Sequence, residues 1–298
     1  MDAAIRAWLE HQLAARVIEA HAFTGGVTST ILGLTDATGR RSVLRMMTEE
    51  PWRRHGRDLT LRERAAQRTL LAAPDVPAPR SIAVDAEGEV AGVALHLMSR
   101  RPGDPLAATA AIGEVQLAAM ADLLARIHAV TPDEPYRTFQ SWAWPAKRVV
   151  PPWTRVPASW ERAFALLDAP APAYEPHFLH RDFSHRNLLW NGDPTTGTIS
   201  GVVDWVEAST GPAWLDAAHA ATTLAVHLGP TPARAFLTAY ARLSEEPLDA
   251  HWLVMDAVGF LPPPGREPLF AHPDQLARLD AWLHEVVTGV TGVAVHAG

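Results

Sequence analysis

Residues 180–190 read HRDFSHRNLLW, and residues 199–205 read ISGVVDW. These two stretches carry the polar residues on which the prediction of fold and function depends. Asp182 and Asn187 stand at the two ends of a segment that is predicted to be a loop. Asp204 follows an apolar run typical of a strand, a place where a carboxylate is fixed in position and remains exposed. Together the three side chains offer the oxygen atoms that Mg²⁺ prefers as ligands.

Phosphoryl transfer is a reaction that needs this combination of groups. A carboxylate must orient the attacking hydroxyl and accept its proton, and oxygen ligands must hold Mg²⁺ on the phosphates of a nucleotide. The covalent demands on the protein are small, because positioning and electrostatics do most of the work. The order and spacing of the three side chains, rather than any one of them alone, indicate this chemistry.

The pattern His-x-Asp-x-x-x-x-Asn, followed by an apolar strand that ends in Asp-Trp, resembles the aminoglycoside phosphotransferase family. That family shares the protein-kinase-like fold and is related to small-molecule kinases of the choline kinase type. The resemblance implies that Asp182 is the catalytic base and that His180 braces the loop by hydrogen bonding. It also implies that Asn187 and Asp204 bind Mg²⁺, and that Asp216 makes a structural contact.

The same resemblance implies that a nucleotide, ATP or GTP, binds the N-terminal part of the chain. Residues 23–29 read FTGGVTS and resemble the family's nucleotide loop, in which Gly25 and Gly26 would let backbone amides approach the phosphates. Residues 97–100 resemble the hinge between two lobes. By that resemblance Met98 and Arg100 belong to the part of the chain that faces the nucleotide base.

Arg45 stands at the strand position where the family usually has a lysine that binds the phosphates. Arginine is always charged and can form two parallel hydrogen bonds, so it can hold phosphates with a different geometry. Glu63 lies on the helix that follows and is expected to pair with this cation.

The hydrophobic pattern and the resemblance predict an α+β fold of the two-lobed, protein-kinase-like type. Residues 1–99 are expected to form a nucleotide-binding lobe with a small antiparallel sheet, and residues 100–298 a larger, mostly helical lobe with the catalytic and substrate-binding residues. The boundary is set at the polar, proline- and glycine-containing segment after Met98. In the first lobe we predict a helix over 3–20, a hairpin over 30–46, a helix over 58–73, and strands over 81–85 and 93–98.

Composition excludes several kinds of site. The chain of 298 residues has no cysteine, which excludes disulfides, thiolate zinc sites and cysteine nucleophiles. The formal net charge of −7 argues against nucleic acid as the main partner and is compatible with a cationic substrate. The sequence shows no secretory signal and no apolar run that could span a bilayer, so we expect a cytoplasmic protein with no membrane partner.

Three functional hypotheses follow from these residues. The first is a phosphotransferase. The second is a pseudokinase that binds a nucleotide without catalysis, motivated by Arg45 and by a loop with only two glycines. The third is a metal hydrolase, because His177, His180, Asp182 and His185 are close in sequence and suit zinc.

The acceptor of the phosphotransferase is the least determined part of the prediction. An aminoglycoside or a similar antibiotic is favoured by the resemblance, and macrolides, peptides, sugars and amino alcohols stay open. Asp249 and Asp256 could line a pocket for a cationic substrate. The choice between ATP and GTP, and between a monomer and a dimer, also stays open.

Overall fold

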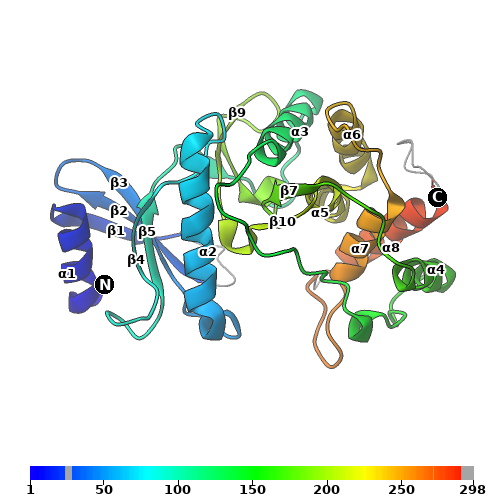
Figure 1. Cartoon of the computed structure of the whole chain (residues 1–298), viewed down its shortest axis with the longest axis horizontal. Coiled ribbons are helices and arrows are strands. Elements are labelled where there is room, and N and C mark those ends of the chain that lie inside the picture. The colour runs from blue at the N-terminus through cyan, green and yellow to red at the C-terminus, as the bar shows by residue number, and fades with distance from the viewer. Residues whose placement is uncertain (24–28, 271, 290–298) are drawn as a thin grey trace. The chain divides into compact units, whose positions relative to one another are not determined.

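The computed structural model describes residues 1–23, 29–270 and 272–289, and it divides into two compact units (Figure 1). The first unit comprises Met1–Pro102 and Gly201–Ala208, and the second comprises Gly103–Ser200 and Ser209–Gly298. The chain therefore returns once to the first unit, and the segment that returns carries Asp204.

An antiparallel sheet forms the centre of the first unit, with the strand order β1-β2-β3-β5-β4. Its strands are β1 (Val17–Ala22), β2 (Thr30–Asp36), β3 (Arg41–Met46), β4 (Ser81–Asp85) and β5 (Leu95–Ser99). The predicted hairpin is present as β2 and β3, and Asp36 fixes its turn by accepting hydrogen bonds from the backbone of Thr38 and Arg40 at 2.9 and 3.1 Å. Two of the predicted strands, over 81–85 and 93–98, correspond to β4 and β5.

The prediction of one helix over residues 3–20 is wrong. Helix α1 spans Ala3–Leu13, and the residues from Val17 onward form β1. Ala14 takes a left-handed conformation with φ of 51°, which ends the helix, and the β-branched pair that starts β1 favours a strand. Helical spacing continued across this break because Ile5, Leu9 and Leu13 of α1 and Val17 of β1 are buried in the same core. Leu34 of β2 and Leu44 of β3 belong to that core as well.

Helix α2 (Gly56–Thr69) also belongs to the first unit, and a 3₁₀ turn stands at each of its ends (Trp52–His55 and Leu70–Ala72). Its buried face carries two polar residues one turn apart, Glu63 and Gln67, each 1% exposed. Polar side chains are rarely buried to this extent without partners, so this face of α2 is expected to meet polar groups.

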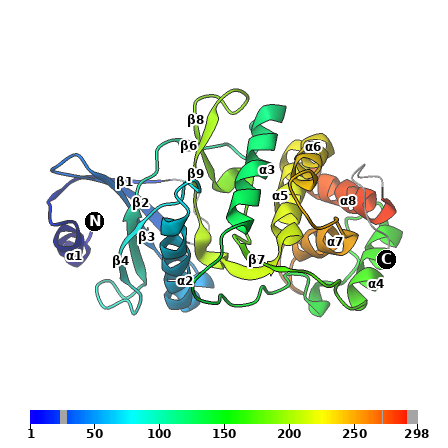
Figure 2. The ribbon, with the colours of Figure 1, turned by 45° about the horizontal axis from the view of Figure 1, so that its top comes forward.

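The second unit is mostly helical, as predicted. Its helices are α3 (Glu114–His128), α4 (Pro157–Asp168), α5 (Ala213–Leu228), α6 (Pro230–Ala241), α7 (Ala250–Gly259) and α8 (Pro273–Thr288). Helix α5 is buried almost all round and contacts α3, α6, α7 and α8, so it forms the centre of this unit (Figure 2). A helix that is buried on nearly every side is typical of such a central position.

Short strands complete the second unit. Strand β7 (Pro176–Leu179) pairs with β10 (Ser209–Pro212), and a second sheet has the order β6-β8-β9, with β6 (Asp104–Pro105), β8 (Leu188–Asn191) and β9 (Thr198–Val202). The loop between β7 and β8 carries Asp182 and Asn187. Among the described residues no helix is both long and apolar enough to cross a membrane.

Candidate active site

The loop after β7 is held by a buried carboxylate of α5. Asp216 accepts a hydrogen bond from the backbone nitrogens of His180 and Arg181, each at 2.7 Å. Arg181 has a positive φ of 71°, a conformation that costs a non-glycine residue roughly 1 kcal/mol or more and persists only when its surroundings fix it. Burial favours a raised pKa for Asp216, but hydrogen bonding and charge from His128 lower it overall, so the carboxylate is ionised. The predicted structural contact of Asp216 is therefore present.

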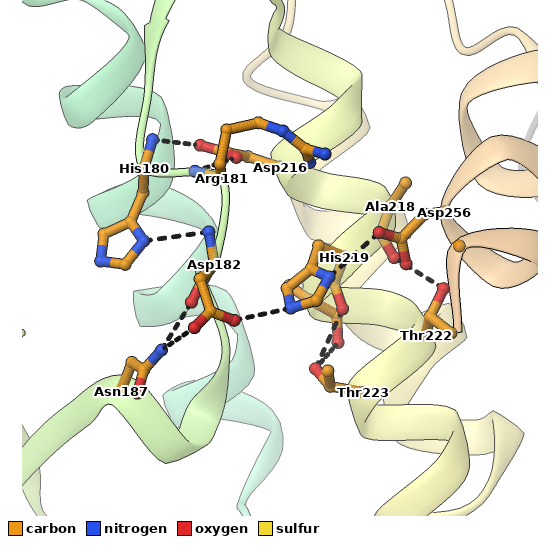
Figure 3. Close-up of polar contacts among 12 residues, drawn as sticks. His180, Arg181, Asp182, Asn187, Asp216, Ala218, His219, Thr222, Thr223 and Asp256 are labelled. Atoms are coloured by element: carbon orange, nitrogen blue, oxygen red, sulfur yellow. Dashed lines mark hydrogen bonds and ion pairs between the residues drawn. The ribbon is translucent and has the colours of Figure 1, made fainter. Parts of the chain in front are cut away.

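The Asp182 carboxylate is fixed on both sides and remains reachable. Its Oδ2 accepts a hydrogen bond from the side-chain amide of Asn187 at 3.0 Å, and its Oδ1 is 2.9 Å from Nε2 of His219 (Figure 3). The side chain is 36% exposed. Burial would raise the pKa of Asp182, but the hydrogen bond and the charge of His219 lower it. The result is an ionised carboxylate in one orientation.

Asn187 and His180 both contact Asp182 by hydrogen bonds. The side-chain nitrogen of Asn187 also donates to the backbone oxygen of Asp182 at 2.8 Å, which leaves its amide oxygen as the atom that can bind a cation. His180 is fully buried, and its Nδ1 accepts a hydrogen bond from the backbone nitrogen of Asp182 at 3.2 Å. This contact has the geometry that the bracing role of His180 requires.

In the first unit, Arg45 lies between two carboxylates. Its Nη1 donates to Oδ1 of Asp204 at 2.7 Å and is 3.5 Å from Oε1 of Glu63. Glu63 also contacts Nδ1 of His96 at 3.0 Å. Burial would raise the pKa of Glu63, but the charge of Arg45 and the contact with His96 lower it to about 2. The ion pair expected between Arg45 and Glu63 is thus present, and it is buried rather than solvated.

Asp204 lies just after the end of β9 in a strained turn. Its φ and ψ are 70° and 59°, in the left-handed region, which a non-glycine residue adopts only when neighbouring contacts impose it. The contacts on this turn include the Trp205 side chain, which is buried and donates to the backbone oxygen of Val202 at 3.0 Å, and Arg62 of α2, which donates to the backbone oxygen of Val206 at 2.6 Å. Such strain concentrates at functional sites.

The remaining residues predicted for the nucleotide fall into two groups. Gly25 and Gly26 lie outside the described residues. Met98 is buried in β5, where its sulfur is 3.5 Å from the side-chain nitrogen of Gln67, and the Arg100 guanidinium lies 5.0 Å from the centre of the Phe23 ring. Their contact with a nucleotide base stays a prediction.

An exchange of Arg45 for lysine tests the buried ion pair. We expect Arg45→Lys to lower the free energy of unfolding by about 1–2 kcal/mol. The lysine side chain is shorter, and its one ammonium group cannot contact the carboxylates of Asp204 and Glu63 at the same time. Urea unfolding monitored by tryptophan fluorescence measures the change. Arg41→Lys, at the exposed start of the same strand, is the matched control and should stay within about 0.5 kcal/mol of the parent. Equal losses in both variants would contradict the account.

His219 was not among the predicted site residues, and Asp256 was considered only as a residue that could line a pocket for a cationic substrate. His219 follows Asp216 by three residues on α5, which puts both on one face of the helix, and this spacing was the available signal. Asp256 is 2% exposed and lies 3.0 Å from Nδ1 of His219, so it does not face solvent as a pocket residue would. Asp249 accepts a hydrogen bond from the backbone of His251 at 2.7 Å and caps the N-terminus of α7.

The histidines considered for a zinc hydrolase do not form a metal site. Over residues 1–23, 29–270 and 272–289, no group of three or more His, Cys, Asp or Glu side chains is arranged to hold a metal ion. Instead, Nδ1 of His177 lies 3.0 Å from the backbone oxygen of His128, and Nε2 of His185 lies 3.0 Å from the backbone oxygen of Ala108. The geometry therefore gives no support to the hydrolase hypothesis.

The buried histidines predict a stability maximum near pH 6.5. Burial lowers the pKa of His185 and of His227 to about 4, so protons bind the unfolded chain more tightly and stability falls as the pH drops from 6.5 toward 4. For His185 this loss is at most roughly 3 kcal/mol. Burial would lower the pKa of His219, but the charges of Asp256 and Asp182 outweigh it and raise the pKa to about 10. The stabilisation that protonated His219 gives the folded protein is therefore fully present below pH 6.5 and is lost as the pH rises toward 10.

Unfolding in urea at a series of pH values from 4 to 10 measures this curve. The expected result is a free energy of unfolding that declines on both sides of its maximum. His185→Gln should flatten the acid side, because the substituted residue does not titrate. A stability that rises steadily across the whole range would contradict the assignment of these charge states.

The sequence was also compared with known proteins. A model of the phosphotransferase enzyme family (APH) matches residues 19–257, which is most of the chain. The chain belongs to this family. Family membership supports a kinase-type enzyme that transfers a phosphoryl group. A search of curated proteins gave no match.

Solved structures of related proteins share the fold. A protein of Ralstonia eutropha JMP134 assigned to the aminoglycoside phosphotransferases is 17% identical, with a TM-score of 0.65 and 98% of each chain covered. A thermostable mutant of aminoglycoside phosphotransferase APH(4)-Ia, in ternary complex with ADP and hygromycin B, is 16% identical, with a TM-score of 0.62 and 98% of this chain and 100% of that chain covered. The amicoumacin kinase hAmiN, in complex with AMP-PNP, Ca²⁺ and Ami, is 12% identical, with a TM-score of 0.59 and 97% and 95% covered. These similarities confirm the predicted α+β, kinase-like fold.

Proposed function

We propose that this phosphotransferase moves the γ-phosphoryl group of ATP or GTP to a hydroxyl of a small molecule in the cytoplasm, and that the acceptor is an aminoglycoside or a similar antibiotic. Inactivation of the antibiotic would then give resistance to the cell. The observation that carries the proposal is the Asp182 carboxylate, which is ionised, partly exposed and oriented by Asn187 and His219 at 3.0 and 2.9 Å. Such a group can orient an acceptor hydroxyl and accept its proton.

Two of the predicted ligands have donor atoms that suit Mg²⁺. Asn187 offers an amide oxygen, since its nitrogen is bonded to Asp182, and Asp204 offers a carboxylate; both are hard oxygen ligands. We assign both residues as ligands of the Mg²⁺ that accompanies the nucleotide. When bound, this ion would offset the negative charge of the phosphates.

The other roles concern binding of the nucleotide. We assign Arg45 to binding of the nucleotide phosphates. Its ion pairs with Glu63 and Asp204 hold the guanidinium in one place before the nucleotide binds. Gly25 and Gly26 are assigned to the phosphates through their backbone, and Met98 and Arg100 to the base. These four assignments rest on the family resemblance.

The preference for an antibiotic acceptor is supported by related proteins. The structure of APH(4)-Ia contains hygromycin B and that of hAmiN contains Ami, and both proteins share the fold of this chain. Sugars, macrolides and amino alcohols are the alternatives within the same reaction. A pseudokinase is disfavoured because Asp182, Asn187 and Asp204 are all present, although Arg45 replaces the usual lysine.

An acceptor screen tests the proposal. Purified protein is mixed with Mg²⁺, ATP or GTP, and a panel of aminoglycosides, macrolides, sugars and amino alcohols, and the products are analysed by mass spectrometry. We expect one class of acceptor to gain a phosphoryl group. Nucleotide binding without a phosphorylated product across the panel would favour the pseudokinase instead.

A further inference from the structure

The Asp182 side chain, on the loop after β7, contacts a buried histidine that the family resemblance did not indicate. His219 of α5 is 4% exposed and lies between two carboxylates, with Nε2 at 2.9 Å from Oδ1 of Asp182 and Nδ1 at 3.0 Å from Oδ1 of Asp256 (Figure 3). Three different parts of the fold supply these groups, namely the loop after β7, α5 and α7. The imidazole therefore connects the proposed base to a carboxylate in the interior.

The geometry defines the protonation state of His219. An ionised carboxylate can only accept hydrogen bonds, so each ring nitrogen that faces one must carry a proton. With both nitrogens protonated, the ring is an imidazolium. A ring in this state has no lone pair with which to take a further proton from Asp182. His219 can therefore hold Asp182 by charge and hydrogen bonding, and it cannot act as the final proton acceptor.

Asp256 depends on His219 for compensation of its charge. Asp256 is 2% exposed, and its Oδ2 has no hydrogen-bond partner within the described part of the chain. The hydrogen bond from His219 is thus the one that supports this buried carboxylate among the described residues. Because an unpaired buried charge is costly, the contact with His219 offsets the cost of burying the Asp256 carboxylate, and the carboxylate in turn favours the protonated imidazole.

Aromatic rings fix the orientation of the imidazole. Phe260 stacks on it with ring centres 5.3 Å apart and an angle of 10° between the planes, and Trp142 meets it edge-on at 5.3 Å. These contacts exclude water from the ring faces and prevent the ring from turning about its two hydrogen bonds. A cation in low-dielectric surroundings acts more strongly on a carboxylate than it would in water.

We propose that His219, held by Asp256, is a positioning residue that fixes the orientation of the Asp182 carboxylate toward the acceptor hydroxyl. This inference rests on the proposed function, because it assigns to Asp182 the role of base. With Oδ1 committed to His219 and Oδ2 oriented by Asn187, the carboxylate has one orientation before the acceptor binds. Orientation fixed in advance lowers the barrier of the transfer step rather than the affinity for substrate.

The test combines kinetics with a double-mutant cycle. His219→Gln alone leaves the buried Asp256 carboxylate without a cation. The central variant is therefore His219→Gln with Asp256→Asn, which removes both of these charges at similar volume. We expect kcat to fall about tenfold to a hundredfold, the loss typical of one charge-assisted hydrogen bond, while KM for nucleotide and acceptor stays within about threefold. Asp256→Asn should lower kcat in the parent and have little further effect beside His219→Gln.

A matched control separates positioning from packing. His251 is buried on α7, the helix of Asp256, and is 5% exposed. His251→Gln removes a buried imidazole from the same helical unit and should leave kcat within about twofold of the parent. A parent-like kcat in the folded double variant would overturn the positioning role, and so would an equal loss of kcat in His251→Gln.

A spectroscopic readout does not depend on turnover. In ¹⁵N-labelled protein at pH 8, His219 should give two protonated ring nitrogens, identified by their loss in His219→Gln, and Asp182→Asn should shift the Nε2 signal. A neutral ring at this pH would overturn the inference. Absence of phosphoryl transfer by the parent protein would instead overturn the proposed function, and the ring signals would still report whether His219 holds Asp182.

Discussion

Asp182→Asn should lower kcat by about a thousandfold and leave the fold intact. General-base catalysis contributes roughly 10²- to 10⁴-fold, and an amide at this position neither accepts the hydroxyl proton nor carries the charge that pairs with His219. The substitution preserves shape, so the hydrogen bond from Asn187 can persist on the amide oxygen. Steady-state kinetics with the acceptor found in the screen give kcat, and circular dichroism together with urea unfolding report the fold.

The matched control for this variant is Asp133→Asn. Asp133 is an exposed carboxylate in the same unit and has no role in the proposed site. Its substitution should leave kcat within about twofold. A rate close to the parent's in Asp182→Asn would remove Asp182 from the role of base and, with it, the mechanistic proposal.

Asp216→Ala should lower the free energy of unfolding by about 2–6 kcal/mol, because two buried backbone donors lose their acceptor and each unsatisfied donor costs roughly 1–3 kcal/mol. The carboxylate is fully buried and accepts hydrogen bonds from two backbone nitrogens at 2.7 Å, and His128 is 3.3 Å from it. Its removal leaves these donors unsatisfied and releases the left-handed backbone of Arg181. Urea unfolding measures the loss, which is a large share of the stability of a typical domain.

Two further variants make this prediction specific. Asp216→Asn keeps one acceptor oxygen, so it should lose less stability than Asp216→Ala. Asp122→Ala on α3 removes an exposed carboxylate that pairs with Arg126, and it should cost less than about 1 kcal/mol because surface ion pairs contribute little. Similar losses in Asp216→Ala and Asp122→Ala would contradict the role of Asp216 in holding the loop.

The parts of the site that sequence could predict are those encoded by short-range spacing. Asp182 and Asn187 are five residues apart and contact each other directly, so their relation follows from one loop. The hairpin of residues 30–46 follows from alternation and a turn. Arg45 and Glu63 also pair as expected, because a strand followed by a helix that packs on its sheet brings them together.

The parts that sequence could not predict depend on packing between distant segments. His219 contacts Asp182 and Asp256, each 37 positions away, and a histidine in a mostly apolar helical segment does not indicate which distant polar group it will contact. The end of α1 was missed for a related reason. Apolar spacing continued from the helix into β1, and only the left-handed Ala14 marks the break.

The contacts of Arg45 explain why an arginine can stand at the position of the usual lysine. Arg45 contacts Asp204 and Glu63 at 2.7 and 3.5 Å, so its charge is balanced within the first unit. A guanidinium is more weakly hydrated than an ammonium and tolerates such burial well. The substitution is therefore compatible with catalysis and does not by itself indicate a pseudokinase.

Transfer of label from nucleotide to acceptor tests most directly whether this protein is a phosphotransferase with Asp182 as its base. The protein is incubated with Mg²⁺ and γ-³²P-labelled ATP or GTP and the acceptor panel, and each reaction is separated to find where the label resides. We expect label on the acceptor with the parent protein and none above background with Asp182→Asn. Label that stays on the nucleotide or appears only as inorganic phosphate, in the presence of every acceptor, would contradict it.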